Sequence, residues 1–574
     1  MNTNLYRLVF NAAHGMLVAV QESAANRGKG RHAGRGMPAA RAATVRFALP
    51  AITLGVWIAM GVPVKAVAQI VADPNAGAHR PTVGQTANGL PQVDITRPSA
   101  AGVSLNHYSQ FDVNKPGAIL NNSPTIVATQ QAGYINGNPN LLPGQGARII
   151  VNQVTGTMPS QLQGYVEVAG ARSEVVIANP NGLMVNGLGF INTSRATLTT
   201  GTPVFGGSGS LDAFRVTGGQ ILVQGAGMNA ANVDQVDLIA RAVQANASLY
   251  ANRLNVIAGA NQVDHDTLRI NPIAGAGLGP GPAQGIDVAQ LGGMYANKIL
   301  LASTEQGVGV SLRGIAAAQA GDLTLTTQGK LVLAGQTNAS GNLTAHARDG
   351  IDNSGTTYAT QAVSLDTDGV LSHTGTLAAQ QQLDVKGGSV NSTGTLAAGV
   401  NQDGTVAAPA DLVVSATGTL TATGRNQASG NATLRGGSVT LAGSQTSAVG
   451  NLDLTASAGD LDLTGATNTA GAGLTANASG VVVNDRGQMS SRGATTLTAG
   501  SISNAGGQLV SQGAMTLQSA GAINNGQGTV QAGGALNASA CAACGGCCGR
   551  WGSCKSGGDC DRSSSKTKRW SNGY

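Results

Sequence analysis

The sequence predicts an all-β protein: a right-handed parallel β-helix, or solenoid, that follows a capped N-terminal domain. Three observations predict it. Glycine is abundant at 84 of 574 residues, while aromatic residues make up 3% and charged residues 10%, as expected for narrow layers of small side chains. A short alternating strand recurs about every 20 residues from Gly321 onward. The chain is also rich in β-branched residues, which disordered chains lack.

Residues 1–68 are the first predicted element, an extended signal peptide. Residues 48–64 are apolar and uncharged, follow a segment with several arginines, and lead to Ala66-Val67-Ala68 before Gln69. These are the parts of a secretory signal, so we expect cleavage between Ala68 and Gln69. A transmembrane anchor is the alternative, but proline and glycine interrupt the run, which is shorter than the roughly 20 residues that span a bilayer.

The signal is longer than the roughly 15 to 30 residues of ordinary signal peptides. Its first part, MNTNLYRLVFNAAHGMLVAVQE, resembles the extended signal region of very large exported proteins of Gram-negative bacteria. That group includes autotransporters and the exoproteins of two-partner secretion. The resemblance implies passage through the periplasm to the exterior or the cell surface.

The charge of the body excludes a nucleic-acid partner. The whole chain has a formal net charge of +6, but residues 69–540 keep 19 of the 33 basic residues and 24 of the 27 acidic ones. Their net charge is therefore about −5. Phosphate binding needs a clustered basic surface in the working domain, and the sequence offers none there.

Cysteine is confined to one end of the chain. All six cysteines lie in residues 541–574, and residues 1–540 have none. An exported chain enters an oxidising compartment where thiols pair, and a closed disulfide loop would obstruct threading through a narrow pore. The absence of cysteine suits a chain that crosses the outer membrane unfolded.

Residues 315–540 are predicted to be β-helical repeats of about 20 residues. Strands such as LTLTT, at 323–327, alternate in polarity and end at glycine or asparagine corners such as Asn353-Ser354-Gly355 and Asn504-Ala505-Gly506. Ten strand starts follow at spacings of 20 to 22 residues, with one step of 29 that contains the insertion AGVNQDGTVAAPA: Leu323, Leu343, Val363, Leu383, Leu412, Ala432, Leu452, Leu474, Thr495 and Met515. The chain lacks the L-x-x-L-x-L-x-x-N frame of leucine-rich repeats and the regular Gly-Gly-x-Gly-x-Asp of calcium-binding nonapeptide repeats.

Residues 69–314 are predicted to cap the open end of the stack. Four stretches, at 102–123, 175–201, 253–263 and 291–310, resemble the amino-terminal secretion domain of filamentous haemagglutinin and other two-partner exoproteins. The resemblance implies that an outer-membrane pore protein recognises this domain through its periplasmic modules.

Two asparagine tetrads are the candidate secretion motifs: NPNL, formed by Asn138, Pro139, Asn140 and Leu141, and NPNG, formed by Asn179, Pro180, Asn181 and Gly182. Proline fixes φ and asparagine tolerates left-handed geometry while bonding nearby backbone groups, so each tetrad should form a tight turn. The turns either fix strand register or contact the transporter directly. Both roles are compatible, since an early rigid corner could nucleate the first coil.

Enzyme sites are poorly supported, and no cofactor or metal is expected. Asp264-His265-Asp266 could ligate a metal, but such a triplet is more often a solvated loop. Residues 275–281 (GAGLGPG) have no strand-then-helix context for a phosphate loop and are predicted to be a flexible linker.

Residues 541–574 share neither period nor composition with the repeats and are expected to be an aberrant, disordered tail from a frameshift or truncated gene. Their cysteine spacing matches no closed zinc frame.

The sequence thus predicts a secreted, non-enzymatic adhesin at a Gram-negative surface that binds an unnamed receptor on host cells or bacteria. The delivery stalk of a contact-dependent toxin or haemolysin is the alternative. A β-helical polysaccharide-active enzyme is a third possibility.

Overall fold

A computed structural model describes residues 70–273 and 279–540 in full. Elsewhere it describes only the backbone of Cys541 and of four strands: β1 (Tyr6–Asn11), β2 (Met16–Gln21), β61 (Cys548–Arg550) and β62 (Lys568–Trp570). The chain divides into two compact units, Met1–Lys65 and Ala66–Tyr574. In the first unit, β1 and β2 pair antiparallel. No helix within the described residues is both long and apolar enough to cross a bilayer.

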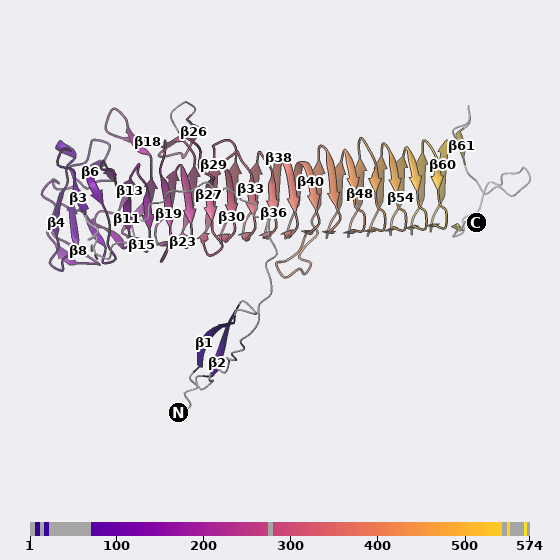
Figure 1. Ribbon diagram of the computed structural model, residues 1–574, viewed down its shortest axis with the longest axis horizontal. Coiled ribbons are helices and arrows are strands. Elements are labelled where there is room, and N and C mark those ends of the chain that lie inside the picture. Colours follow the sequence, from indigo (N-terminus) through magenta and orange to yellow (C-terminus); the bar gives the residue numbers. More distant parts are fainter. Residues whose placement is uncertain are drawn as a thin grey trace, which may run out of the picture. The chain divides into compact units, whose positions relative to one another are not determined.

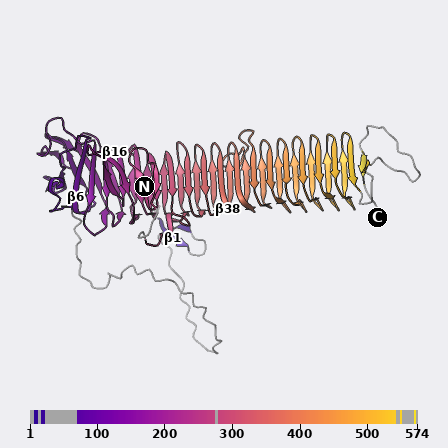
Figure 2. The same ribbon diagram turned by 90° about the horizontal axis from the view of Figure 1, so that it is seen from above.

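The second unit is a parallel β-solenoid of about 18 turns, drawn as a rod in Figures 1 and 2. Each coil contributes three strands. One coil consists of β32 (Leu323–Thr327), β33 (Leu331–Leu333) and β34 (Gln336–Ala339), and each pairs in parallel with its counterpart in the next coil: β35 (Leu343–Ala347), β36 (Ile351–Asn353) and β37 (Thr356–Ala359). The predicted all-β fold and parallel stacking are confirmed.

The first strands of successive coils form one continuous ladder. They are β6 (Val103–Phe111), β10 (Ile149–Val154), β13 (Ser173–Ala178), β16 (Thr193–Thr199), β21 (Gln235–Ala240), β24 (Arg253–Ala258), β29 (Lys298–Ser303), β32, β35, β38 (Val363–His373), β40 (Leu383–Ser392), β42 (Leu412–Ala416), β45 (Ala432–Gly436), β48 (Leu452–Ala456), β51 (Leu474–Ala478), β54 (Thr495–Ala499), β57 (Met515–Ser519) and β60 (Leu536–Cys541). The ten strand starts predicted from the repeat lie opposite one another in this ladder, from Leu323 to Met515.

The core is a single apolar column along the solenoid axis. In β32 the leucines Leu323 and Leu325 are buried and Thr326 is exposed, so alternation places one face inward. Coils approach each other closely at their corners, where a Cβ on Gly355 would overlap the carbonyl oxygen of Gly335. Each coil buries its apolar face only against its neighbours, so stability accumulates along the stack.

Antiparallel strands cap the N-terminal end, as predicted. β3 (Ile70–Ala72) pairs antiparallel with β6, and β4 (Thr82–Gln85) pairs antiparallel with β5 (Pro91–Asp94). β5 then lies parallel to β7 (Ala118–Asn122), the third strand of the first coil. The cap is shorter than the predicted 69–314, because coils already stack from β6 onward.

Two antiparallel additions lie outside the coils. A four-stranded side sheet contains β17 (Thr202–Phe205), β18 (Leu211–Arg215), β25 (Asn261–Asp264) and β26 (Ile270–Pro272). Figure 1 shows β18 and β26 on the upper edge of the rod. The side sheet buries a second apolar cluster against the outer face of the first strands, including Val151, Val176, Phe214 and Ile257. A hairpin of β8 (Val127–Thr129) and β9 (Gly133–Ile135) makes a smaller such cluster with Ile119 and Ala169.

The predicted insertion is also present. After β41 (Thr395–Ala398), an isolated antiparallel bridge joins Val400 to Val406 before β42 resumes the ladder. The corner predicted at 353–355 differs in detail, because β36 runs through Asn353, and the side chains of Asn353 and Asn504 are buried.

Most of the tail lies outside the described residues. Its strand β61 pairs antiparallel with β60, and β62 pairs antiparallel with β59 (Thr529–Ala532).

Candidate functional site

The NPNG tetrad is a β-turn between β13 and β14 (Leu183–Val185), and it is tied to the preceding turn of chain. Asn179 is fully buried, and its Nδ2 donates to the carbonyl oxygen of Met158 at 2.9 Å. Its Oδ1 accepts the backbone N–H of Asn181 at 3.0 Å, and its carbonyl oxygen accepts the N–H of Gly182 at 3.0 Å. The side chain of Asn181 donates to the carbonyl oxygen of Gly156 at 2.8 Å.

The NPNL tetrad repeats this pattern at an earlier corner. Asn138 is buried, and its Nδ2 donates to the carbonyl oxygens of Ile95 and Asn121, both at 2.9 Å. Its Oδ1 accepts the N–H of Asn140 at 2.9 Å, and its carbonyl oxygen accepts the N–H of Leu141 at 3.2 Å. Asn140 also donates its side chain to the carbonyl oxygen of Ile95, at 3.2 Å.

The two tetrads therefore share one design but lie at different corners. The first asparagine satisfies buried backbone carbonyls and closes a side-chain-to-backbone turn, while the second reaches back to an earlier segment. The expected left-handed geometry is found only at Gly182, whose φ is +120°. The prolines connect these asparagines, and Pro180 is exposed. The signal-cleavage residues Ala66, Ala68 and Gln69 lie outside the described residues, as does most of the glycine-rich segment at 275–281.

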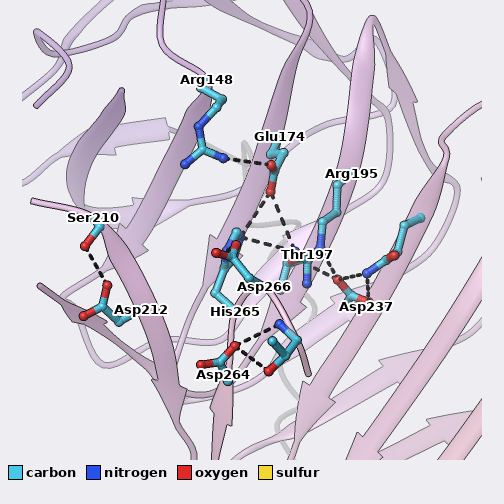
Figure 3. Close-up of polar contacts among 12 residues, drawn as sticks. Arg148, Glu174, Arg195, Thr197, Ser210, Asp212, Asp237, Asp264, His265 and Asp266 are labelled. Atoms are coloured by element: carbon cyan, nitrogen blue, oxygen red, sulfur yellow. Dashed lines mark hydrogen bonds and ion pairs between the residues drawn. The ribbon is translucent and has the colours of Figure 1, made fainter. Parts of the chain in front are cut away.

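A buried polar cluster joins the side sheet to the solenoid (Figure 3). His265 follows β25 and is 1% exposed, so the prediction that residues 264–266 form a solvated loop is wrong at this position. Its Nε2 lies 3.1 Å from Oε2 of Glu174 on β13, and its Nδ1 lies 2.7 Å from Oδ1 of the exposed Asp266. Packing of Phe214 against His265 removes the ring from water.

An arginine extends the cluster across the first strands. Nε of Arg195, on β16, lies 2.5 Å from Oδ2 of Asp237, which is buried on β21. Asn255 on β24 donates to Oδ1 of Asp237 at 2.7 Å. Nη1 of Arg195 lies 3.5 Å from Nε2 of His265. The cluster thus connects β13, β16, β21 and β24 to the side sheet.

The carboxylate of Glu174 is held in its charged form. Burial alone would raise its pKa, but the polar contact with His265 and the charges of His265, Arg195 and Arg148 together outweigh burial, and the net effect lowers the pKa. The acids of the cluster are engaged in ion pairs. Within the described ranges, no group of three or more histidine, cysteine, aspartate or glutamate side chains is arranged to hold a metal.

Sequence reasoning missed this cluster, although a signal for it exists. Arg195 and Asp237 are single charges within the strands TSRATLT and QVDLIA, which are mostly buried. A lone charge in an apolar strand requires a partner, because burying an unpaired ion is costly. Opposite charges on neighbouring strands were therefore a detectable pair.

Comparisons with known families agree with this architecture. A model described as "TPS secretion domain" matches residues 68–333. A second, "Extended Signal Peptide of Type V secretion system", matches residues 1–51. A third, "Haemagglutinin repeat", matches four overlapping segments at 338–399, 394–465, 447–519 and 490–545. The sequence resemblance to these groups is confirmed.

Similar proteins are much longer than this chain. The chain is 55% identical to "tRNA nuclease CdiA-2" of Burkholderia pseudomallei (strain 1026b) over 85% of its own length and 16% of that protein. It is 46% identical to "Toxin CdiA" of Yersinia pestis over 62% of its length and 11% of that protein. A crystal structure of the filamentous hemagglutinin secretion domain is 32% identical, with a TM-score of 0.43, over 54% of this chain and 96% of that one.

Proposed function

We propose that this chain, a two-partner-secretion exoprotein by its TPS secretion domain, haemagglutinin repeats and extended signal, is recognised through residues 69–314 by its outer-membrane partner. The signal and the secretion domain direct the protein through the periplasm to the surface of a Gram-negative cell. The secretion domain implies an outer-membrane partner protein. In this proposal residues 1–68 are the signal, 315–540 begin the exposed fibre, and 541–574 take no part.

The observation that carries the proposal is the match of the secretion-domain family to residues 68–333, the segment that contains the cap, the first coils and both tetrads. These features come first in the chain after the signal. Coil-by-coil folding outside the cell would oppose backsliding, since each new coil docks on the one before it. Export driven by such folding would not need ATP hydrolysis.

Export with and without the partner tests the proposal. The full chain would be expressed in a Gram-negative host with its outer-membrane partner, with a channel-blocked partner, or alone, and the medium and periplasm would be assayed. We expect release only with the open partner. Equal release in all three strains would refute recognition by a pore.

We further propose that residues 315–540 form a non-catalytic stalk of the kind that delivers a contact-dependent toxin. The names of the relatives, a tRNA nuclease and a toxin, favour this alternative over a simple adhesin. The matched families describe secretion and repeats, a region without catalytic function. Incubation of the purified chain with tRNA should leave the tRNA intact, whereas cleavage would place a nuclease in these residues.

Adhesion to a receptor on host cells or other bacteria completes the proposal, with the solenoid as the presenting surface. Binding of the purified, labelled chain to whole bacteria and to cultured cells tests it. If the chain binds to no cell type, the adhesive part of the proposal is wrong.

A further inference from the structure

The third strands of successive coils carry a line of outward-facing side chains that is rich in tyrosine. These strands are β12 (Tyr165–Gly170), β15 (Leu188–Ile191), β20 (Met228–Ala230), β23 (Ser248–Ala251), β28 (Gly293–Ala296), β31 (Ile315–Ala318), β34, β37 and β39 (Thr376–Ala379). Their register places nine residues opposite one another, here called the tyrosine column: Tyr165, Gly189, Asn229, Tyr250, Tyr295, Ala317, Asn338, Tyr358 and Ala378.

The column concentrates a scarce residue type. The whole chain has eight tyrosines, and four of them are in this one line. The flanking residues of the same strands, such as Leu249 and Met294, are buried in the solenoid core, so the column faces outward. Tyr165 and Tyr250 are 42% and 44% exposed. Packing within the core therefore does not explain the tyrosines.

Two of the rings lie flat over glycine. A Cβ on Gly189 would meet the ring of Tyr165 at 2.3 Å, and a Cβ on Gly293 would meet the ring of Tyr295 at 2.6 Å. Tyr250 and Tyr295 stack with ring centroids 5.1 Å apart and planes inclined by 15°. These contacts hold the rings in an ordered row along the column.

The far end of the column is covered by the chain itself. Tyr358 is 8% exposed and packs with Ala378, Ala397 and Val400, at the start of the insertion. Its hydroxyl donates to the carbonyl oxygen of Val400 at 3.5 Å. In Figure 1, the insertion projects from the lower edge of the rod, where β15 and β23 are labelled. The chain thus already uses one column tyrosine as a docking point and leaves Tyr165 to Asn338 uncovered.

We propose that this uncovered part of the tyrosine column binds a neutral glycan chain. Six coil steps at about 4.8 Å each give it a length of roughly 30 Å, which suits an extended oligosaccharide. The C–H groups on a pyranose face carry partial positive charge and are attracted to the negative face of an aromatic ring. The column has no charged side chain, so an ionic ligand would gain nothing there.

Amides between the rings supply the polar part of such a site. Asn229 is exposed in the column, and Asn338 is half-buried there. Sugar hydroxyls can hydrogen-bond to the exposed part of such side-chain amides. Tyrosine is also common at protein interfaces, so the test below includes self-association as the competing outcome. This inference rests on the proposed adhesive function and gives its ligand a chemical class.

The test uses the purified full chain in native gels that contain dextran, mannan or hydroxyethyl cellulose, with dextran sulfate as the anionic comparison. We expect at least one neutral polysaccharide to retard the protein. Tyr250→Ser and Tyr295→Ser should each weaken binding roughly threefold to tenfold, and the double variant should abolish it. Tyr250→Phe should retain binding, because it keeps the ring.

Two matched controls separate the column from general effects. Tyr134→Ser removes a tyrosine that is 79% exposed outside the column and should bind as the unaltered protein does. Gly293→Ala should displace the Tyr295 ring and weaken binding, whereas Gly207→Ala, where a Cβ meets nothing within 4 Å, should not. Binding is measured on purified protein, so a failure of export leaves this result intact.

Three outcomes would overturn the proposal. These are absence of binding to every neutral polysaccharide, binding only to dextran sulfate, and equal binding by all tyrosine variants. If the unaltered chain binds no glycan but self-associates, and the double variant does not self-associate, the column would instead bind a second copy of the chain.

Discussion

Single polar side chains hold the early coils together by bonding between segments that are distant in sequence. Asn179 and Asn138 are buried because their amides replace water at backbone carbonyls that the corners leave unpaired. Arg195 instead joins strands through its ion pair with Asp237, and His265 joins them through its polar contact with Glu174. Both kinds of contact lie within the first coils, where an error would affect every coil that docks later.

Asn181→Ala tests whether the NPNG tetrad has a role beyond that of a corner. The variant loses the bond to Gly156, which contributes about 0.5–1.5 kcal/mol, and we expect a several-fold fall in release through the partner. Asn232→Ala is the matched control, since Asn232 is also an exposed corner residue that donates to a preceding carbonyl, that of Phe190 at 2.7 Å. Equal release of the two variants, measured in the medium, would leave the tetrad a purely structural turn.

Glu174→Gln tests the buried cluster through its pH dependence. The folded pKa of Glu174 is lowered from 4.5, so its contribution to stability is complete above that pH and is lost as the pH falls through the lower folded value. We expect hydrogen exchange in β18 and β25, corrected for intrinsic rates, to rise below about pH 4.5 in the unaltered protein. The variant should exchange faster at pH 7 and respond less to acid.

Asp322→Asn is the control for that measurement. Asp322 also has a lowered pKa, mainly from its bond with the backbone N–H of Asn342, but it contacts other coils. Faster exchange of the side sheet in this variant, or an unchanged acid response in Glu174→Gln, would contradict the role given to Glu174.

At the scale of the elements, strands differ in how many of their faces are buried. β13 (SEVVIA) is buried on both faces because the side sheet covers its outer side, so the alternation that identified the later repeats is lost there. The third strands, such as β34 (QTNA), bury only a threonine and an alanine. Periodicity could therefore predict the first strands of the repeats but neither the early coils nor the third strands.

Leu412→Ala tests the additivity of the stack. Leu412 is fully buried in β42, and its truncation should cost about 2–5 kcal/mol locally. We expect hydrogen exchange to become faster in β40, β42 and β45. The exchange rates of β10 and β13 should stay unchanged, because each coil contacts only its neighbours. Val413→Ala, at an outward position of the same strand, should change little. Loss of protection throughout the rod would mean that the coils unfold as one unit.

For the whole molecule, the sequence foretold the parallel stack, its cap and its insertion, because each leaves a local pattern. Lone charges in buried strands could have indicated the Arg195–Asp237 pair, but nothing local in the sequence indicates that His265 and Glu174 join it, since they meet only after several coils have formed. The outward tyrosines escaped notice for the same reason: their spacing in sequence is irregular, and only the register of the third strands aligns them.

The cysteine-rich tail offers a test of threading. Six thiols in residues 541–574 can pair in an oxidising periplasm, and any closed loop would hinder passage through a pore. Truncation after Ala540 should therefore leave release equal or higher, and a reductant should help only the full chain. Loss of release on truncation, or stoichiometric zinc in the purified tail, would instead make the tail a working domain.

The central claim is that the partner recognises the segment from Gln69 to Gly314. A fragment of residues 1–320 ends just after β31, so its last coil is complete. Expressed with the outer-membrane partner, this fragment should appear in the medium as efficiently as the full chain and should remain in the periplasm when the partner is absent. Retention of the fragment beside a released full chain would contradict the claim.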